Sequence, residues 1–262
     1  MILEQIWTAN DYRNFNYLVA CPESGEALAI DPVDHEKCLA IAKDKGWDIT
    51  QVVNTHEHGD HIAGNQPVID ATGAKLLAHA NAKDSIPGVG QGLGAGDVIK
   101  VGKTVELECL DTPGHTMSHI CLLWRGEMPA LICGDTLFNA GVGNCGSGDP
   151  VALYQTFAGQ LAQLADRTLV YPGHDYIATN LKFTLDREPD NPVAKALLAD
   201  IADQDPADPL VTHLALEKQI NTFLRLDQPA VIEQLHEAFP DLPAEPDRKT
   251  VFLKLRELRN SW

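Results

Sequence analysis

The sequence predicts an α/β protein in which a region of strands and helices is followed by a helical one. Up to residue 174, short apolar runs typical of strands alternate with turns and helical patterns. After residue 174 the strand-like runs disappear, and helical patterns separated by Pro and Asp follow. We therefore expect one domain over residues 1–174 and a second over residues 175–262.

The N-terminal region is expected to form an antiparallel meander and then a helix. Strands are expected over Ile2–Trp7, Asn16–Ala20 and Glu26–Ile30, with a Pro-Glu-Ser-Gly turn before the third. A helix is expected over residues 34–45 because Asp34 is a suitable N-cap.

Three histidines and an aspartate lie within residues 55–61, which read Thr-His-Glu-His-Gly-Asp-His and follow the strand-like run 49–54. On a turn, rather than at helical spacing, they can share a partner only if the backbone curls around it. Imidazole and carboxylate ligands without cysteine favour a catalytic divalent ion over a structural one. Four donors are too many for one tetrahedral catalytic ion, so a two-ion site is expected.

Further donors for such a site occur downstream, at His115, Asp135 and His174. Each follows an apolar strand-like run, and strand ends in a layered domain gather along one edge of a sheet. We therefore expect these side chains to converge on the 55–61 segment. The runs are Val105–Leu110, Ala130–Cys133 and Thr168–Tyr171.

Between these donors, a short helix after Gly64 and a strand over Lys75–Ala78 are expected. His79 lies outside the donor pattern and is interpreted as structural or exposed. Glycine-rich residues 86–97 resemble a dinucleotide loop but lack the strand-turn-helix context that such a loop requires. Residues 141–146 do precede a helical pattern, and we interpret them as a rim of the metal pocket.

That helical pattern begins at Pro150, with Asp149 as its N-cap, and its apolar face extends to Leu164. Five more helices are expected in the C-terminal segment. They are Tyr176–Leu185, Val193–Ala202, Thr212–Leu226, Ala230–Phe239 and Thr250–Arg259.

Composition narrows the function classes. The net charge of −17 over 262 residues repels polyphosphate, so we expect no nucleic-acid partner. No export signal and no apolar run approaching eighteen residues is visible, so no membrane partner is expected. The six cysteines contain no Cys-x-x-Cys pair, which indicates reduced thiols and a cytoplasmic location. We expect a monomer that acts on a small molecule.

The donor pattern resembles the metallo-β-lactamase superfamily, and its spacing together with the C-terminal half resembles the hydroxyacylglutathione hydrolase, or glyoxalase II, branch. The resemblance implies an αββα sandwich followed by a smaller all-helical domain that closes over the site. It also implies that His56, His58 and His115 hold one ion, that Asp60, His61 and His174 hold the other, and that Asp135 bridges the two.

The implied activity is hydrolysis of S-acyl thiol esters by two divalent ions, with S-lactoylglutathione as the expected substrate. Zinc is the expected metal, and iron or manganese are alternatives. Asp60 would also orient the attacking hydroxide. Alternative readings are another thiol carrier, a lactone or β-lactam as substrate, persulfide dioxygenation with one iron, or a non-enzymatic binding module. The complete ligand set argues against the binding module, and the Asp60–His61 pair and long helical tail argue against the dioxygenase.

The resemblance also implies substrate contacts. Tyr176 stands two residues after the last ligand, where the family contacts the thiol peptide. Arg256 and Arg259, three apart on one helix face, match the basic pair that holds the glycine carboxylate. The sequence departs from the family at Asn144 and Gly146, where a basic residue and a tyrosine are usual. We count Asn144 as a candidate contact, and the departure bears on the identity of the thiol carrier.

Overall fold

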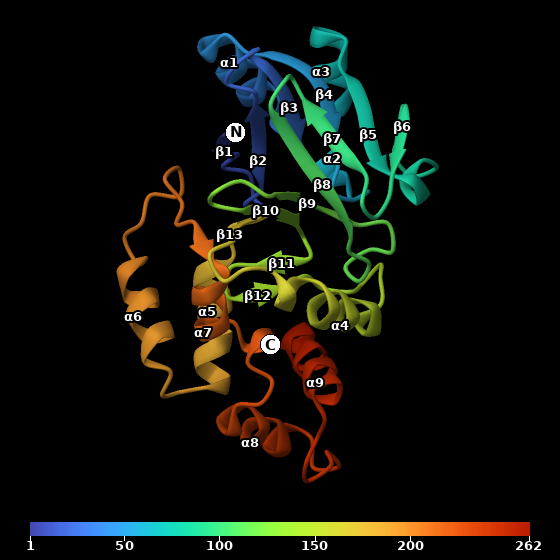
Figure 1. Ribbon diagram of the computed structural model, residues 1–262. Coiled ribbons are helices and arrows are strands. Elements are labelled where there is room, and N and C mark those ends of the chain that lie inside the picture. Colours follow the sequence, from blue (N-terminus) through green and yellow to red (C-terminus); the bar gives the residue numbers. More distant parts are fainter.

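Two six-stranded sheets packed face to face form the centre of the molecule, and the computed structural model describes all 262 residues (Figure 1). Helices cover the outer face of each sheet, so the expected αββα order of layers is present. No helix combines the length and the apolar content needed to span a lipid bilayer.

The first sheet contains the N-terminal strands in sequence order, antiparallel from β1 to β3 and parallel from β3 to β6. Helices α1 (His35–Lys45) and α3 (Asn65–Thr72) pack on its outer face. The six strands are β1 (Ile2–Trp7), β2 (Phe15–Ala20), β3 (Glu26–Ile30), β4 (Asp48–Val53), β5 (Lys75–His79) and β6 (Gln91–Leu93).

Strand β2 contributes side chains to two apolar layers, one on each face of the first sheet. Phe15, Tyr17 and Val19 pack between the two sheets, whereas Leu18 and Ala20 pack on the opposite face, toward the helices. All five side chains are almost completely buried. Successive residues of a strand point to opposite faces, so a continuous apolar run is what a strand covered on both sides requires.

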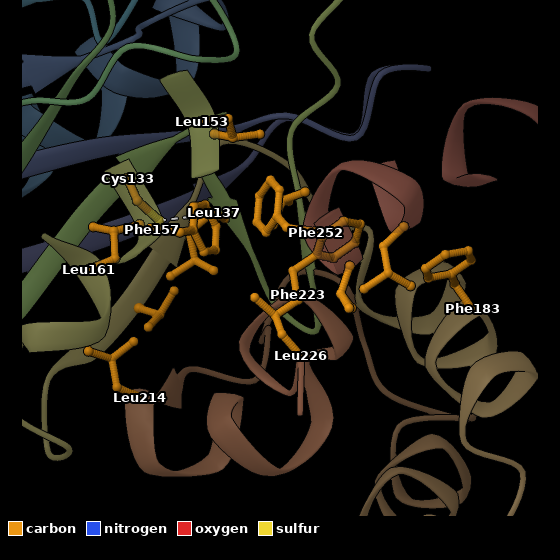
Figure 2. Packing of buried hydrophobic residues seen from close by; sticks show 14 of the residues in the cluster. Cys133, Leu137, Leu153, Phe157, Leu161, Phe183, Leu214, Phe223, Leu226 and Phe252 are labelled. Carbon is orange, nitrogen blue, oxygen red and sulfur yellow. Dashed lines mark hydrogen bonds between the residues drawn. The ribbon is translucent and has the colours of Figure 1, made fainter. Parts of the chain in front are cut away.

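The second sheet has the order β14-β13-β10-β9-β8-β7. Its outer face carries α4 (Pro150–Gly159) and the C-terminal segment. Figure 2 shows Phe157 of α4 in one apolar cluster with Phe223 and Phe252 of that segment. The strands are β7 (Val98–Val101), β8 (Val105–Asp111), β9 (Ile120–Trp124), β10 (Ala130–Gly134), β13 (Leu169–Pro172) and β14 (Thr212–His213).

The C-terminal helices gather beside β13 and below the small hairpin of β11 (Leu137–Phe138) and β12 (Gly141–Val142) in Figure 1. They enclose an apolar cluster of their own that includes Leu181, Ala194 and Ile220. Their bounds are α5 (Ile177–Arg187), α6 (Pro192–Asp200), α7 (Leu214–Ile220), α8 (Pro229–Ala238) and α9 (Arg248–Ser261).

The expectation of one helix over Thr212–Leu226 was wrong, and so was the expectation that the C-terminal segment lacks strands. Residues 212–213 form β14 at the edge of the second sheet, because His213 is extended and its ring caps the start of α7. The helix ends at Asn221, whose side chain accepts from the Phe223 amide and starts a 3₁₀ turn. These two capping side chains interrupt the apolar periodicity that predicted a single helix.

Two shorter departures lie near the site. Helix α4 ends at Gly159, and Leu161 lies in a separate 3₁₀ turn, because Gln160 leaves helical geometry. The glycine-rich 86–97 segment contains strand β6, to which the sequence assigned no element. A Cβ on Gly92 would lie 2.9 Å from the Cα of Ala80, so glycine is required there for close packing.

Candidate metal centre

The four predicted donor segments meet at one edge of the sandwich, where β4, β8, β10 and β13 end. His56 and His58 lie in the loop after β4. Asp60 and His61 lie in the short helix α2 (Gly59–Ile62), so the expectation of a simple turn was wrong for this half of the motif. The helix places Asp60 and His61 side by side with His174.

Three imidazoles form the first half of the centre. The Nδ1 atom of His58 lies 3.0 Å from Nε2 of His56 and 2.9 Å from Nε2 of His115. At that spacing the three atoms can face one ion from three sides, as a zinc site with one open position requires.

The second half contains Asp60, His61 and His174. The Nε2 atoms of His61 and His174 are 3.2 Å apart. Oδ2 of Asp60 lies 3.8 Å from Nε2 of His61 and 3.6 Å from Nε2 of His174. These three ligand atoms also fall within the range that one ion would span.

Asp135 lies between the two halves. Its Oδ2 is 3.5 Å from Nε2 of His115 in the first half and 3.2 Å from Nε2 of His174 in the second, and its Oδ1 is 3.4 Å from Nε2 of His61. Oδ1 is buried and has no hydrogen-bond partner. A buried carboxylate oxygen without a partner is costly unless a cation completes it. The donor set therefore fits bound divalent metal, and Asp135 lies within reach of donors from both halves.

The protonation states of His56, His115 and Asp135 suit metal binding, whereas His61 must lose a proton before it can bind an ion. Burial lowers the pKa of His56 and His115, so both rings are neutral at pH 7. Burial disfavours the ionised form of Asp135, but the nearby His174 and His61 rings outweigh it and hold its pKa well below the usual value. Burial also opposes the charged form of His61, yet Asp135 and Asp31 raise its pKa to about 9. Neutral imidazole and ionised carboxylate are the ligand forms.

In each of the five histidines, the ring nitrogen that does not face the centre contacts an oxygen atom that orients the ring. The sequence could not identify these oxygen atoms. Such outer contacts fix the tautomer and the ring plane of a ligand. The contacts are His56 Nδ1 with Thr55 Oγ1 at 3.0 Å, His58 Nε2 with Ser147 Oγ at 2.7 Å, His61 Nδ1 with Asp31 Oδ2 at 3.0 Å, His115 Nδ1 with the Asn144 carbonyl at 2.7 Å, and His174 Nδ1 with the Tyr12 carbonyl at 2.7 Å.

Asp31 is the most connected of the residues that sequence reasoning missed. Besides His61, its carboxylate accepts from the amide and the hydroxyl of Thr55, at 2.8 and 2.6 Å, and it is 3% exposed. It holds φ +47°, which is unusual for a residue other than glycine. The one available signal was the Asp-Pro pair that ends β3, and that pair indicated only a turn.

His119 was also missed, because it falls in no ligand spacing. Its ring stacks on His56 at 5.1 Å between centroids, and its Nε2 accepts from the backbone amide of Asp135 at 3.2 Å. Thr112 and Thr136 contact its Nδ1 at 2.9 and 3.0 Å. His119 therefore holds the backbone of Asp135 rather than joining the candidate ligand set. His79 is buried and outside the donor set; its Nδ1 accepts from the amide of Asn81, and its Nε2 lies 3.5 Å from Oδ1 of Asp111.

The four predicted substrate contacts lie around one cavity of about 240 Å³ beside the centre, which Phe138 and Asn180 also line. Tyr176 stacks on the His174 ring at 4.9 Å, and its hydroxyl donates to the carbonyl of Tyr12. Asn144 is exposed at the rim. The sequence predicted that these positions share a ligand; they line one cavity, and the shared ligand stays a prediction.

Arg256 and Arg259 are not equivalent in this cavity. Arg256 is 5% exposed. Its Nη1 donates to the carbonyls of Val142 and Gly143 and its Nη2 to Oδ1 of Asn260, so only its Nε is without a partner. Arg259 is more exposed and lies over the rings of Phe183 and Trp262. The sequence treated the two as one basic pair, whereas the structure gives Arg256 a second role in holding the backbone.

Comparison with known proteins defines the class first. A family model described as "Metallo-beta-lactamase superfamily" matches residues 16–193. A metallo-beta-lactamase from Staphylococcus aureus has a similar fold, with a TM-score of 0.65, 22% identity and coverage of 98% of this chain and 72% of that one. The structure of ETHE1 from Myxococcus xanthus has a TM-score of 0.68, 25% identity and coverage of 100% and 99%. Fold and donor set thus define a metallo-β-lactamase superfamily hydrolase that uses divalent metal.

The branch follows from the sequence relatives. A hydroxyacylglutathione hydrolase of a Polaromonas species is 69% identical over 263 residues, and one of Nitrosococcus oceani is 65% identical, each covering 100% of both chains. A family model described as "Hydroxyacylglutathione hydrolase C-terminus" matches residues 175–262. The chain belongs to the hydroxyacylglutathione hydrolase family, which confirms the resemblance read from the sequence.

Proposed function

We propose that this enzyme hydrolyses S-acyl glutathione thioesters, with S-lactoylglutathione as the main substrate, to give lactate and glutathione. The observation that carries the proposal is the complete donor set around Asp135, next to a cavity lined by two arginines and amide side chains. The full-length relatives carry the corresponding name at 69% and 65% identity.

We propose that His56, His58 and His115 hold one ion, that Asp60, His61 and His174 hold the other, and that Asp135 contacts both. Zinc is our first choice, and iron or manganese would accept the same donors. When bound, such a pair supplies Lewis acidity and lowers the pKa of water toward about 7.

The side chains of the centre would orient the attacking water, and no side chain is needed to protonate the leaving thiolate. The carboxylate of Asp60, which accepts from the Asn14 side chain at 3.3 Å, would also accept a hydrogen bond from the attacking water and orient it. Thiols have a pKa of about 8.5, so the thiolate can leave without a dedicated acid. The low-lying pKa of Asp135 keeps that carboxylate ionised throughout.

Substrate binding would use the cavity beside the centre. Tyr176 would contact the peptide, and Arg259 together with the free Nε of Arg256 would hold its terminal carboxylate. The family's basic and aromatic side chains are absent at Asn144 and Gly146. Asn180 and Asn260, which line the same cavity from the helical segment, are our candidates for replacing those contacts.

We also propose that the chain divides at residue 174 into a catalytic domain and a substrate-binding helical domain, and that the enzyme works in the cytoplasm. In support of the first, cavity residues Arg256, Arg259 and Asn260 come from α9. In support of the second, all six cysteines are free thiols, as expected in a reducing compartment.

The test compares S-lactoylglutathione with an acyl-coenzyme A, a homoserine lactone and a β-lactam, with metal content measured on the same sample. We expect the glutathione thioester to be preferred, activity to disappear after chelation, and activity to return with two equivalents of metal per chain. Oxygen consumption with glutathione persulfide and no thioester hydrolysis would overturn the proposal.

A further inference from the structure

A small hairpin lies in sequence between Asp135 and Asn144, whose side chain and carbonyl, respectively, belong to the metal centre. It consists of β11 (Leu137–Phe138) and β12 (Gly141–Val142), which pair through two residue pairs and join neither large sheet. A two-stranded hairpin without further partners is marginally stable at best. Its conformation must therefore be fixed by contacts from outside.

Both ends of this hairpin belong to the centre. Asp135 lies two residues before it, and the Asn144 carbonyl, two residues after it, accepts from Nδ1 of His115 at 2.7 Å. A Cβ on Gly143 would lie 1.9 Å from the carbonyl oxygen of Asp135. The two ends are thus in direct contact, and a displaced hairpin would move a candidate bridging ligand and the support of a candidate histidine together.

Side chains from the C-terminal segment bind the hairpin backbone almost residue by residue. Every one of these side chains is more than nine-tenths buried. The contacts are Asn221 Nδ2 to the Gly141 carbonyl at 3.0 Å, Asn180 Nδ2 to the Asn139 carbonyl at 3.0 Å, Arg256 Nη1 to the Gly143 carbonyl at 3.1 Å, and the Ala140 amide to Glu217 Oε2 at 2.8 Å.

Glu217, on α7, is at the centre of this arrangement and is completely buried. Its carboxylate also accepts from Thr212 Oγ1 at 2.6 Å, Asn221 Nδ2 at 3.2 Å and Asn139 Nδ2 at 3.5 Å. Ala140 holds φ +57°, a left-handed conformation that is unfavourable for alanine. A charge-assisted bond to the Ala140 amide offsets that cost and keeps the hairpin tip in place.

We propose that Glu217 is a positioning residue for the metal centre, because it fixes the tip of hairpin 137–142 and through it the separation of Asp135 and the Asn144 carbonyl. The inference rests on the proposed function only in taking Asp135 and His115 as ligands. It gives the helical segment a second task beyond substrate binding, namely that it shapes the centre through a bond to Ala140, which lies 77 residues from Glu217 in sequence.

A matched pair of variants separates positioning from ordinary stabilisation. Glu217→Gln replaces a buried carboxylate by an amide of the same shape. Glu188→Gln does the same at another buried glutamate of the helical segment, which accepts from Arg225 Nε and Nη2, both at 2.7 Å, and has no hydrogen bond to the hairpin. Both variants remove a buried charged acceptor, but only one of them contacts the hairpin.

The first readout is the dissociation constant of zinc, titrated against a chromogenic chelator. The second is hydrogen exchange of the Gly143 amide in the metal-free protein; this amide donates to the Thr136 carbonyl and does not touch Glu217. We expect Glu217→Gln to weaken zinc binding about tenfold, as outer contacts of metal ligands commonly do, and to speed Gly143 exchange. Glu188→Gln should lower Tm but keep the zinc constant within about twofold of wild type, since it leaves those outer contacts intact.

Equal losses of zinc affinity in both variants, or unchanged Gly143 exchange in Glu217→Gln, would overturn the positioning role. If Glu217→Gln does not fold, Asn139→Ala removes the hairpin's side-chain contact to Thr212 and should shift both readouts in the same direction. Wild-type protein that binds zinc but spares thioesters would refute the proposed function alone. Normal thioesterase activity with indistinguishable variants would refute the positioning role alone.

Discussion

Replacing Asp31 by asparagine should weaken binding of one ion specifically, the one proposed to be held by Asp60, His61 and His174. We call it the second ion. In the native protein Oδ1 accepts from the Thr55 amide, and Oδ2 accepts from the Thr55 hydroxyl and from Nδ1 of His61. Asparagine can keep its oxygen at the first position, which places its amide N–H groups opposite His61. The imidazole must then accept at Nδ1 and carry its proton on Nε2, the atom that faces His174.

The size of the effect follows from what is lost. One buried charge-assisted hydrogen bond contributes about 1.5–3 kcal/mol, and loss of an outer contact typically costs 10–100-fold in metal affinity. The nearby carboxylates hold the pKa of His61 at about 9 against the effect of burial, so in wild type a proton competes with the ion below that pH. Removing one carboxylate lowers this pKa, so the pH dependence of second-ion binding should shift to lower pH in Asp31→Asn.

The assay is competitive titration of zinc at several pH values, with thermal unfolding of the metal-free protein alongside. Asp34→Asn is the matched control, because Asp34 lies three residues away, caps α1 through the Lys37 amide and does not contact the centre. Asparagine caps helices about as well as aspartate, so this control should bind both ions normally. Unchanged affinity for the second ion in Asp31→Asn would refute the reasoning about the His61 tautomer.

Three further predictions concern the centre and its cavity. In Gly173→Ala the new Cβ would lie 2.3 Å from Oδ1 of Asp135, so we expect the unfolding free energy to fall by about 1–3 kcal/mol and bound metal to be lost. Full metal content by elemental analysis would contradict this prediction. Arg256→Ala and Arg259→Ala should both raise KM. Only Arg256→Ala should also lower the unfolding free energy, by about 1–3 kcal/mol, because it removes hydrogen bonds to backbone carbonyls; equal Tm values of the two variants would contradict this. Burial raises the pKa of Cys145 to about 11 against the opposing effect of Arg256, so this thiol should be alkylated slowly and about tenfold faster per pH unit between pH 7 and 10. Cys38, Cys109, Cys121 and Cys133, whose pKa values burial also raises and which are more deeply buried, should stay unreacted, and mass spectrometry of the modified peptides checks both points.

Much of the fold could be predicted from local chemistry. The β2 run from Phe15 to Ala20 is apolar at every position except Asn16, which is how a strand covered on both faces must read. The caps Asp34 and Asp149 fixed the starts of two helices because their carboxylates accept from the first free amides. Prediction failed at Thr212–Leu226, where His213 and Asn221 cap a helix much shorter than the apolar pattern suggested.

The sequence by itself determined the candidate metal donors of this protein. Histidines and aspartates directly after strand-like runs can converge at a sheet edge, and their spacing resembles that of the family to which the chain belongs. Only the tertiary structure decided how these groups are held. Asp31, His119 and Glu217 carry no recognisable spacing, because a hydrogen bond between a buried side chain and a distant loop leaves no local pattern in the chain. Those contacts depend on how the layers and helices pack, and packing brings together residues that the sequence keeps far apart.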